Sequence, residues 1–397
     1  MKKLLMATAA AALTAGTAFA GGHAKEVKIG VLLGYTGPIE SLSPNMAASA
    51  ELAMEEVTKS GKLLDSATVT PIRADTGCID NGLAVANAEK LIAEGVSGIM
   101  GSDCSGVTGA VLQNVALANG MVMISPSATS PGLSAMEDNG LFFRTAPSDA
   151  REGEIMADIL TDRGVESIAI TYTNNDFGKG LSDSISKSFE AKGGEVTIVA
   201  AHEDGKGDYS AEVASLASAG GDVLVVAGYL DQGGLGIIRS ALDSGAFDTF
   251  GLPNGMIGDS LPKNVGPDLD GSFGQIAGSD SEGAAIFAEM AKEAGYDGTT
   301  SFTGESYDAA ALLMLAMQAA GSMKPADYAG KVMDVANAPG EKINPGELGK
   351  ALEILANGGE IDYQGATGVE LIEPGESAGS YREIEVKDGK NETVKFR

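Results

Sequence analysis

The strongest constraint on the fold is an alternation of short apolar runs and helical patterns that extends over residues 26–252. Val27–Leu33 has the composition of a buried strand and ends at the turn Gly34–Pro38, after which a helical pattern begins near Asn45. The alternation pauses at Phe142–Ser148 and then starts again as a second series. Repeated strand–helix–strand units form parallel sheets with helices on both faces. The sequence therefore predicts an α/β protein with two doubly wound lobes that face each other across a cleft.

The segment after residue 274 predicts helices first and strands last. Gly304–Gly321 is rich in Ala, Leu and Met, which is typical of a helix that is buried on most sides. Val369–Ile372 and Tyr381–Val386 have strand patterns. We expect the helical block to return to the first lobe and the chain to finish in the second, with Gly375–Ser380 as a crossing between them.

The N-terminus has the three parts of an export signal. Two lysines precede an apolar run, Leu4–Ala15, and the small-residue pattern Ala18-Phe19-Ala20 follows. The apolar run is too short to span a bilayer, and no later stretch approaches the ~20 uninterrupted apolar residues of a membrane helix. We therefore expect residues 1–20 to be a signal peptide that is cleaved after Ala20. The mature protein is expected to be exported and soluble, with no direct membrane insertion.

The charge of the chain bounds its partners. The formal net charge is −28 at pH 7, and such a surface repels nucleic acid and anionic membranes. It favours a freely diffusing protein without a nucleic-acid partner. The long-range field also admits zwitterions and cations more easily than anions, although salt screens this effect over ~10 Å.

Cys78 and Cys104 are the only cysteines in the chain. In an oxidising compartment such a pair usually forms a disulfide, and closing this loop would contribute roughly 3–4 kcal/mol in the chain-entropy model. Two buried free thiols are the alternative.

Two stretches end a short apolar run in small hydroxyl residues, Ile99–Thr108 and Ile124–Thr129. The first leads directly into a helical pattern, Val107–Leu117. A strand that turns into a helix leaves several backbone N–H groups without partners, and these groups suit a carboxylate. Each stretch alone is also consistent with an ordinary capped turn. Together, one strand apart, they favour a site for a small anionic group.

The patterns of catalytic and metal sites are missing. The two histidines, His23 and His202, have no accompanying acid or nucleophile pattern and are expected to be surface or satisfied residues. Gly375–Gly379 matches G-x-S-x-G, but the required histidine does not follow and the surrounding pattern is that of a strand. Phosphate-binding loops and His/Cys metal spacings are also lacking, so we expect no metal and no cofactor. The sequence predicts binding and not catalysis.

An ordered set of short motifs now identifies a family resemblance. The set comprises the exported N-terminus, Tyr35-Thr-Gly-Pro38, Cys78 and Cys104, Ser105, Ile124-Ser-Pro-Ser-Ala-Thr129, Asn175-Asp-Phe-Gly-Lys-Gly180, Gly228-Tyr229 and Tyr307-Asp-Ala-Ala310. It covers essentially the whole mature chain. The chain resembles the branched-chain amino-acid (Leu/Ile/Val) family of type I periplasmic substrate-binding proteins of ABC importers.

The resemblance implies a Venus-flytrap architecture with a three-crossing hinge. Lobe 1 would comprise residues 25–146 and 276–373, and lobe 2 residues 147–275 and 374–397. It also implies that Cys78 and Cys104 are paired. The protein would work as a periplasmic monomer that delivers a small molecule to the transmembrane subunits of an ABC permease.

The resemblance further implies a set of ligand contacts. Ser105, Ser127 and Thr129 would hold the ligand α-carboxylate, which agrees with the anion site predicted from the strand–helix turns. Phe177 and Tyr229 would close over the ligand from the facing lobe. The expected ligand-contacting set also includes Ala128 and Tyr35.

One position departs from the family pattern. The acid that commonly pairs with the ligand ammonium group aligns with Asn254, and losing a charge-assisted contact costs roughly 1.5–3 kcal/mol. Asp231 and Asp103 are the candidates for a compensating acid, although both also suit ordinary turn or cap roles. Position 177 is Phe where the family usually has an aromatic hydroxyl.

Three functional hypotheses follow. The first is capture of a branched-chain or related amino acid for import. The second keeps the fold and role but takes an amide, a urea-like compound or an aromatic or organic acid, and Asn254 favours it. A sensory role for the same fold is a variant of both, whereas a hydrolase that uses Ser377 conflicts with the missing histidine.

Overall fold

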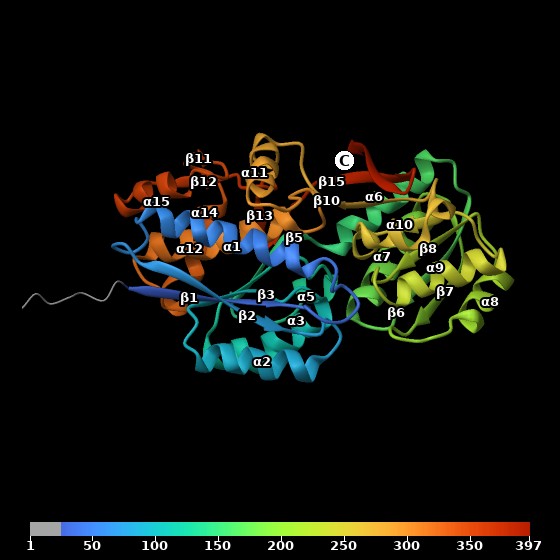
Figure 1. The fold of residues 1–397 in the computed structure, drawn as a ribbon, viewed down its shortest axis with the longest axis horizontal. Helices are drawn as coiled ribbons and strands as arrows, with labels where there is room; N and C mark the ends of the chain where they lie inside the picture. The colour runs from blue at the N-terminus through green and yellow to red at the C-terminus, as the bar shows by residue number, and fades with distance from the viewer. Residues whose placement is uncertain (1–24) are drawn as a thin grey trace, which may run out of the picture.

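Two seven-stranded sheets organise residues 25–397, which the computed structural model describes. The expected signal peptide and its cleavage after Ala20 lie outside the described residues. Figure 1 shows the sheets in two lobes that lie side by side, with residues from about 150 to 275 forming most of the right-hand lobe. We use lobe 1 for the sheet that contains β1 (Glu26–Leu33) and lobe 2 for the sheet that contains β6 (Ser167–Thr173).

The first sheet has the strand order β13-β14-β5-β4-β3-β1-β2, and the second has the order β16-β15-β10-β9-β8-β6-β7. The further strands of lobe 1 are β2 (Thr68–Asp75), β3 (Gly98–Gly101), β4 (Met123–Ser125), β5 (Phe142–Pro147), β13 (Leu371–Ile372) and β14 (Glu376–Ser377). Those of lobe 2 are β7 (Glu195–His202), β8 (Val223–Ala227), β9 (Phe250–Leu252), β10 (Phe273–Ala277), β15 (Tyr381–Lys387) and β16 (Lys390–Phe396). A separate parallel pair consists of β11 (Glu341–Ile343) and β12 (Ile361–Tyr363).

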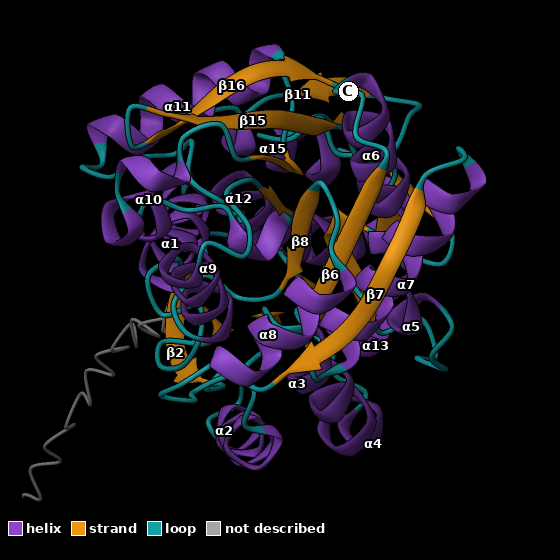
Figure 2. Cartoon of the chain, turned by 90° about the vertical axis from the view of Figure 1, so that its right-hand side faces the viewer, coloured by secondary structure: helices purple, strands orange, loops and turns teal. Residues whose placement is uncertain are grey.

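Helices cover both faces of each sheet. In lobe 1, α1 packs on α12 over one face, and α2 and α3 cover the other. In lobe 2, α6 packs on α7, and α8 packs on α9 over the opposite face. Figure 2 looks onto lobe 2 and shows β6, β7 and β8 beside one another. The helix bounds are α1 (Ser43–Ser60), α2 (Asn81–Ala93), α3 (Ser105–Val111), α4 (Leu117–Asn119), α5 (Pro131–Ser134), α6 (Asp149–Asp162), α7 (Asp176–Ala191), α8 (Ser210–Ala219), α9 (Gly233–Ser244), α10 (Ser260–Val265), α11 (Glu282–Glu293), α12 (Thr303–Ala320), α13 (Pro325–Tyr328), α14 (Val332–Ala336) and α15 (Leu348–Ala356).

Each sheet reverses its winding direction at one point. In lobe 1, β1 pairs in parallel with both β2 and β3, and in lobe 2, β6 pairs in parallel with both β7 and β8. The chain therefore leaves neighbouring strands toward opposite faces at these positions, and a crevice forms outside their carboxyl ends. The loops after β1, β3, β6 and β8 are thus placed to form a site.

Three segments connect the lobes. The first runs from β5 to α6, the second from β10 to α11, and the third from β14 to β15. Because β14 belongs to the first sheet and β10 reaches Ala277 in the second, the crossings begin a few residues beyond the expected boundaries at 373/374 and 275/276.

The predicted alternation of strands and helices is confirmed. The C-terminal part of the chain adds a buried helix and antiparallel strands. The helix expected at 304–321 is α12, and nearly all of its residues are buried. The tail differs from a purely parallel arrangement, because β15 pairs antiparallel with both β10 and β16. Within residues 25–397, we find no helix that is both long enough and apolar enough to cross a membrane.

Candidate ligand-binding site

The loops at the two reversal points face each other and enclose a cavity. Its lining residues are Ile39, Leu42, Met46, Asp103, Cys104, Ser105, Ser127, Phe177, Tyr229, Asn254, Gly255 and Phe302. They come from both lobes, which identifies the cavity as an inter-lobe cleft. Its volume of about 20 Å³ accommodates about one water molecule, so a larger solute enters only when the lobes move apart.

Ser105 and the Ser127–Ser130 turn form one hydrogen-bonded unit on the lobe 1 side. The Ser105 hydroxyl oxygen accepts a hydrogen bond from the backbone N–H of Ser130 at 3.0 Å, so the hydroxyl keeps its own hydrogen for donation. Ser127 Oγ donates to the carbonyl of Asp103 at 3.1 Å. Ser105 also begins α3, whose first backbone N–H groups have no partners within the helix. The two predicted anchor stretches therefore lie together at the cleft.

Arg144 stabilises this turn through its backbone carbonyl groups. No sequence pattern marked this residue. Its guanidinium donates to the carbonyl oxygens of Ala128 at 3.0 Å and Ser130 at 2.9 Å. The residue is 1% exposed and pairs with Glu376 of β14. The shape of the turn thus depends on a buried cation that touches its backbone and not the cleft.

Cys78 and Cys104 form a disulfide, so the alternative of two free thiols is wrong. The bond ties the loop after β2 to the residue that precedes α3. Asp103 lies beside it and accepts hydrogen bonds from Thr76 Oγ1 at 3.1 Å, from the Cys104 N–H at 2.9 Å and from the Gly34 N–H. Although Asp103 lines the cleft, its carboxylate oxygens are already used to hold three loops.

Lobe 2 contributes a stacked aromatic pair. The rings of Phe177 and Tyr229 are 5.0 Å apart between centroids, with 18° between their planes. Phe177 lies in the first turn of α7, which the Asn175 side chain caps by accepting from the Gly178 N–H at 3.0 Å. The buried Tyr229 hydroxyl has no hydrogen-bond partner among residues 25–397.

Asn254 reaches the cleft from lobe 2 and rests on two buried acids. Its side-chain amide donates to the Glu152 carboxylate and, at 3.3 Å, to Asp149 Oδ1. Its backbone N–H donates to Glu152 Oε1 at 2.8 Å, and Gln275 Nε2 donates to the same oxygen at 3.0 Å. Both acids belong to the first turn of α6, directly after the first crossing.

Burial sets the protonation of this acid pair. It raises the pKa of Asp149 to about 6, although the Glu152 carboxyl favours the ionised form. Burial and the nearby charge of Asp149 raise the pKa of Glu152 well above its usual range. The pair therefore holds less negative charge near neutral pH than two exposed carboxylates, but it remains a source of negative potential beneath Asn254.

Four of the ten predicted ligand residues lie outside the cavity lining, namely Tyr35, Ala128, Thr129 and Asp231. Thr129 lies beside the acid pair, because its carbonyl accepts from the Asp149 N–H at 2.8 Å. Its hydroxyl is buried without a hydrogen-bond partner in the described part of the chain. Asp231 instead bridges the lobes, where its carboxylate accepts from the Ser41 N–H at 2.9 Å and from Ser260 Oγ at 2.7 Å.

The residues that were considered for catalysis lie in surroundings that fit structural roles. Ser377 lies in strand β14 and not in a strand-to-helix turn. His202 is buried and shares a hydrogen bond of 2.8 Å with Thr171 Oγ1. Within residues 25–397, no group of three or more His, Cys, Asp and Glu side chains is arranged to hold a metal ion.

The fold has two lobes, three segments that connect them, and a polar cleft between opposed strand ends. These features define a binding protein that closes around a small solute. Comparison with known proteins specifies this class further. Residues 26–338 match the family model described as periplasmic binding protein, and the chain belongs to this family.

The relatives agree with that assignment. A Leu/Ile/Val-binding protein homolog 1 from Brucella melitensis is 31% identical over 324 residues, which cover 80% of this chain and 85% of the relative. The crystal structure of the leucine-binding protein LivK from Thermotoga maritima superposes with a TM-score of 0.79 at 23% identity, covering 93% of this chain and 98% of that one. A solute-binding protein from R. palustris in complex with 4-hydroxybenzoate gives a TM-score of 0.75 at 19% identity, covering 94% and 97%. The chain is thus an extracytoplasmic binding protein of the ABC-transporter type.

Proposed function

We propose that the protein captures an amino acid, branched-chain or related, and delivers it to an ABC permease. The observation that carries the proposal is the bond between Ser105 Oγ and the Ser130 N–H, which joins the two anchor stretches at the cleft. Their hydroxyl and amide groups are suited to the ligand carboxylate, with Ser127 and Thr129 in the same turn. Phe177 and Tyr229 then cover the ligand from lobe 2.

The acid pair beneath Asn254 supplies the charge that Asn254 itself lacks. Asp149 Oδ2 is buried without a hydrogen-bond partner among residues 25–397. A ligand ammonium group near Asn254 would be stabilised by this negative potential, since charges interact strongly in a water-excluded site. This assignment replaces Asp231 and Asp103 as compensating acids, because their oxygens hold other groups.

Binding is coupled to closure. The ligand docks on lobe 1 while the cleft is open and shifts the population toward the closed arrangement by contacting both lobes. The closed monomer presents one face from each lobe to the permease. The signal peptide, removed after Ala20, places this step in the periplasm.

A ligand screen followed by substitution of the anchor tests the proposal. Amino acids, amides and small organic acids are compared by thermal shift, where a ligand at ~100 times its Kd adds ~2.7 kcal/mol of stability. The double variant Ser105→Ala/Thr129→Ala should then bind the amino acid more than tenfold more weakly by calorimetry. Ser218→Ala, on the exposed face of α8, is the control. Unchanged affinity in the double variant would contradict the anchor.

A second candidate ligand class is an aromatic or organic acid, an amide or a urea-like compound. The neutral Asn254 and the stacked pair Phe177–Tyr229 favour it, and the R. palustris protein of the same fold was crystallised with 4-hydroxybenzoate. In the screen, stabilisation by benzoates or amides without any amino-acid response selects this class.

A further inference from the structure

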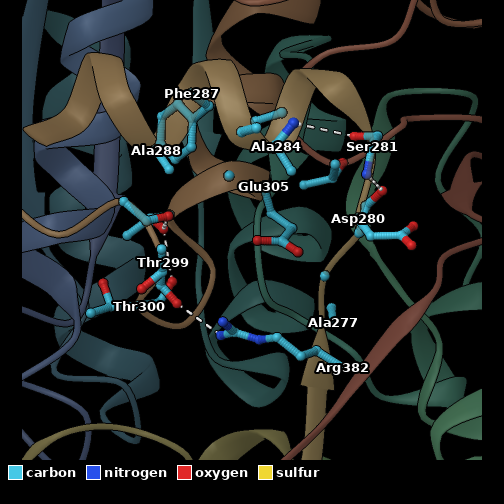
Figure 3. A pocket seen from close by; sticks show the side chains of 18 of the residues that line it. Ala277, Asp280, Ser281, Ala284, Phe287, Ala288, Thr299, Thr300, Glu305 and Arg382 are labelled. Atoms are coloured by element: carbon cyan, nitrogen blue, oxygen red, sulfur yellow. Dashed lines mark hydrogen bonds between the residues drawn. The ribbon is translucent and has the colours of Figure 1, made fainter. Parts of the chain in front are cut away.

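A second cavity lies at the hinge, outside the set of residues that line the cleft (Figure 3). It measures about 310 Å³, which is at the lower end of small-ligand pockets. The second crossing, α11, the start of α12 and β15 form its walls. The residues that matter for its chemistry are Ala284, Phe287, Ala288, Thr299, Glu305 and Arg382.

Glu305 provides a buried acid in this cavity. The residue is 4% exposed, and its side chain extends from α12 with the carboxyl group turned toward Arg382 (Figure 3). Within residues 25–397, its carboxyl group receives no hydrogen bond from another residue, and no lysine or arginine forms an ion pair with it. Its backbone carbonyl accepts from Thr145 Oγ1 at 2.8 Å, which anchors Glu305 to the first crossing.

Arg382 provides a basic group from the other lobe. It lies in β15, and its Nη2 donates to the Thr299 carbonyl at 2.8 Å. Its Nε is buried and has no hydrogen-bond partner among the described residues. Glu305 and Arg382 therefore face one cavity without joining in an ion pair.

The third component is apolar. Ala284, Phe287 and Ala288 of α11 line the same cavity. In such surroundings an acid and a base that are held apart lack a charged partner, and an occupant that carries both charges would stabilise the ionised form of each. A small molecule with an ammonium group, a carboxylate and a short carbon skeleton matches all three components.

We propose that the hinge cavity is a second binding site, for a small zwitterion whose ammonium group pairs with Glu305 and whose carboxylate pairs with Arg382. Glu305 belongs to lobe 1 and Arg382 to lobe 2, so an occupant bridges the lobes at their hinge. Binding at this site is therefore coupled to the opening and closing of the cleft, and the coupling is reciprocal.

Calorimetry on the full mature chain tests this site. The cleft is first disabled with Ser105→Ala/Thr129→Ala, and glycine, L-alanine, β-alanine and L-proline are titrated. At least one should bind saturably to one site, and propionate and ethylamine, which carry one charge each, should bind at least tenfold more weakly. Adding Glu305→Gln or Arg382→Gln should remove the event, whereas Glu293→Gln, exposed near the end of α11, should leave it unchanged.

The outcomes separate the two sites. When each change is made separately in the natural chain, Ser105→Ala/Thr129→Ala should remove one binding event and Glu305→Gln the other. If the cleft variant has no effect while the hinge variants do, the proposed function fails and the hinge site stands. The hinge proposal is overturned if no zwitterion binds, if the single-charge analogues bind equally well, or if the folded hinge variants bind like their parent. Should the hinge variants not fold, the comparison of zwitterions with single-charge analogues decides alone.

Discussion

Asn254 places a neutral amide at the cleft, and the acidic groups lie behind it. The amide of Asn254 lines the cleft, while the carboxyl group of Glu152 beneath it holds both the side chain and the backbone N–H of Asn254. Burial and the charge of Asp149 raise the pKa of Glu152, so the negative charge of the pair lies mainly on Asp149, which also accepts from the Asn254 amide. The acid that we propose for the ligand ammonium group, Asp149, is therefore separated from the cleft by the neutral Asn254.

Asp149→Asn should distinguish ligands by whether they carry an amine. Asp149 acts on the ammonium group across Asn254 and not by direct contact, so removing its charge is expected to cost about 1–2 kcal/mol, or about 5- to 30-fold weaker binding of an amino acid. The corresponding acid without an amine should be affected less than threefold. Titration calorimetry with the matched ligand pair measures both.

Asp231→Asn is the control for this experiment, since Asp231 bridges the lobes outside the cavity lining. We expect it to weaken both ligands equally. An amine-selective effect of Asp231→Asn, with none for Asp149→Asn, would return the role to Asp231.

The titration of Glu305 should lower the free energy of unfolding as the pH rises. Burial, with a smaller contribution from Asp308, raises the pKa of its carboxyl group to about 8 from an ordinary value near 4.5, while its own backbone N–H and Arg382 act in the opposite direction. Between these values the native state keeps a proton that the unfolded chain has lost. The free energy of unfolding therefore falls as pH rises through that window.

Glu305→Gln should remove this contribution. The unfolding free energy of the variant relative to the natural chain should increase steadily from pH 5 to pH 8.5, as measured by urea denaturation. Using the difference cancels the titration of Asp149 and Asp308, whose pKa burial also raises to about 6. A difference that is constant with pH, as expected for the exposed control Glu293→Gln, would contradict the pKa assignment.

At the scale of elements, α3 begins where three loops are fastened together. The disulfide holds Cys104 directly before Ser105, and Asp103 accepts from Gly34 and Thr76 of two other loops. Ser105, the proposed anchor, is thus held in place by covalent and polar contacts that lie outside the ligand contacts proposed above.

Cys78→Ser/Cys104→Ser should therefore affect stability and binding together. The lost cross-link spans 26 positions and predicts about 3–4 kcal/mol less stability in the chain-entropy model. We expect a lower urea midpoint and a weaker affinity, because the start of α3 is less constrained. Reduction of the natural chain should reproduce both changes, and it should not alter the double variant further.

The sequence predicts helices and strands better than it predicts contacts between residues that are far apart in the chain. The alternation that defines β1 to β9 is a local pattern, so the sequence predicts it. The strand β16 is exposed and charged and has no clear apolar face, so no such pattern marks it. The anchor at Ser105 follows from local strand–helix turns. Glu152 could not be assigned in the same way, because its contact with Asn254 spans 102 positions and depends on how α6 packs after the hinge.

The whole molecule is held closed by polar contacts between the lobe faces. Asp231 of lobe 2 accepts from the Ser41 N–H of lobe 1 at 2.9 Å, and its own N–H donates to the Pro38 carbonyl at 3.1 Å. Elsewhere along the cleft, Ser130 Oγ donates to the Asp176 carbonyl at 3.0 Å. These contacts require that the lobes meet, so they stabilise the closed arrangement alone.

Asp231→Ala should shift the lobes toward the open arrangement. It removes the side-chain acceptor for Ser41, and one hydrogen bond contributes about 0.5–1.5 kcal/mol, which corresponds to roughly a 2- to 12-fold smaller closed population. Affinity for any ligand should fall by up to that factor, mainly through faster dissociation. Small-angle X-ray scattering should show a larger radius of gyration without ligand and the natural value at saturation. Asp243→Ala, on α9 and outside the cleft lining, is the control. If dissociation and scattering match the natural chain, Asp231 does not contribute to closure, and the cleft closes through the ligand contacts alone.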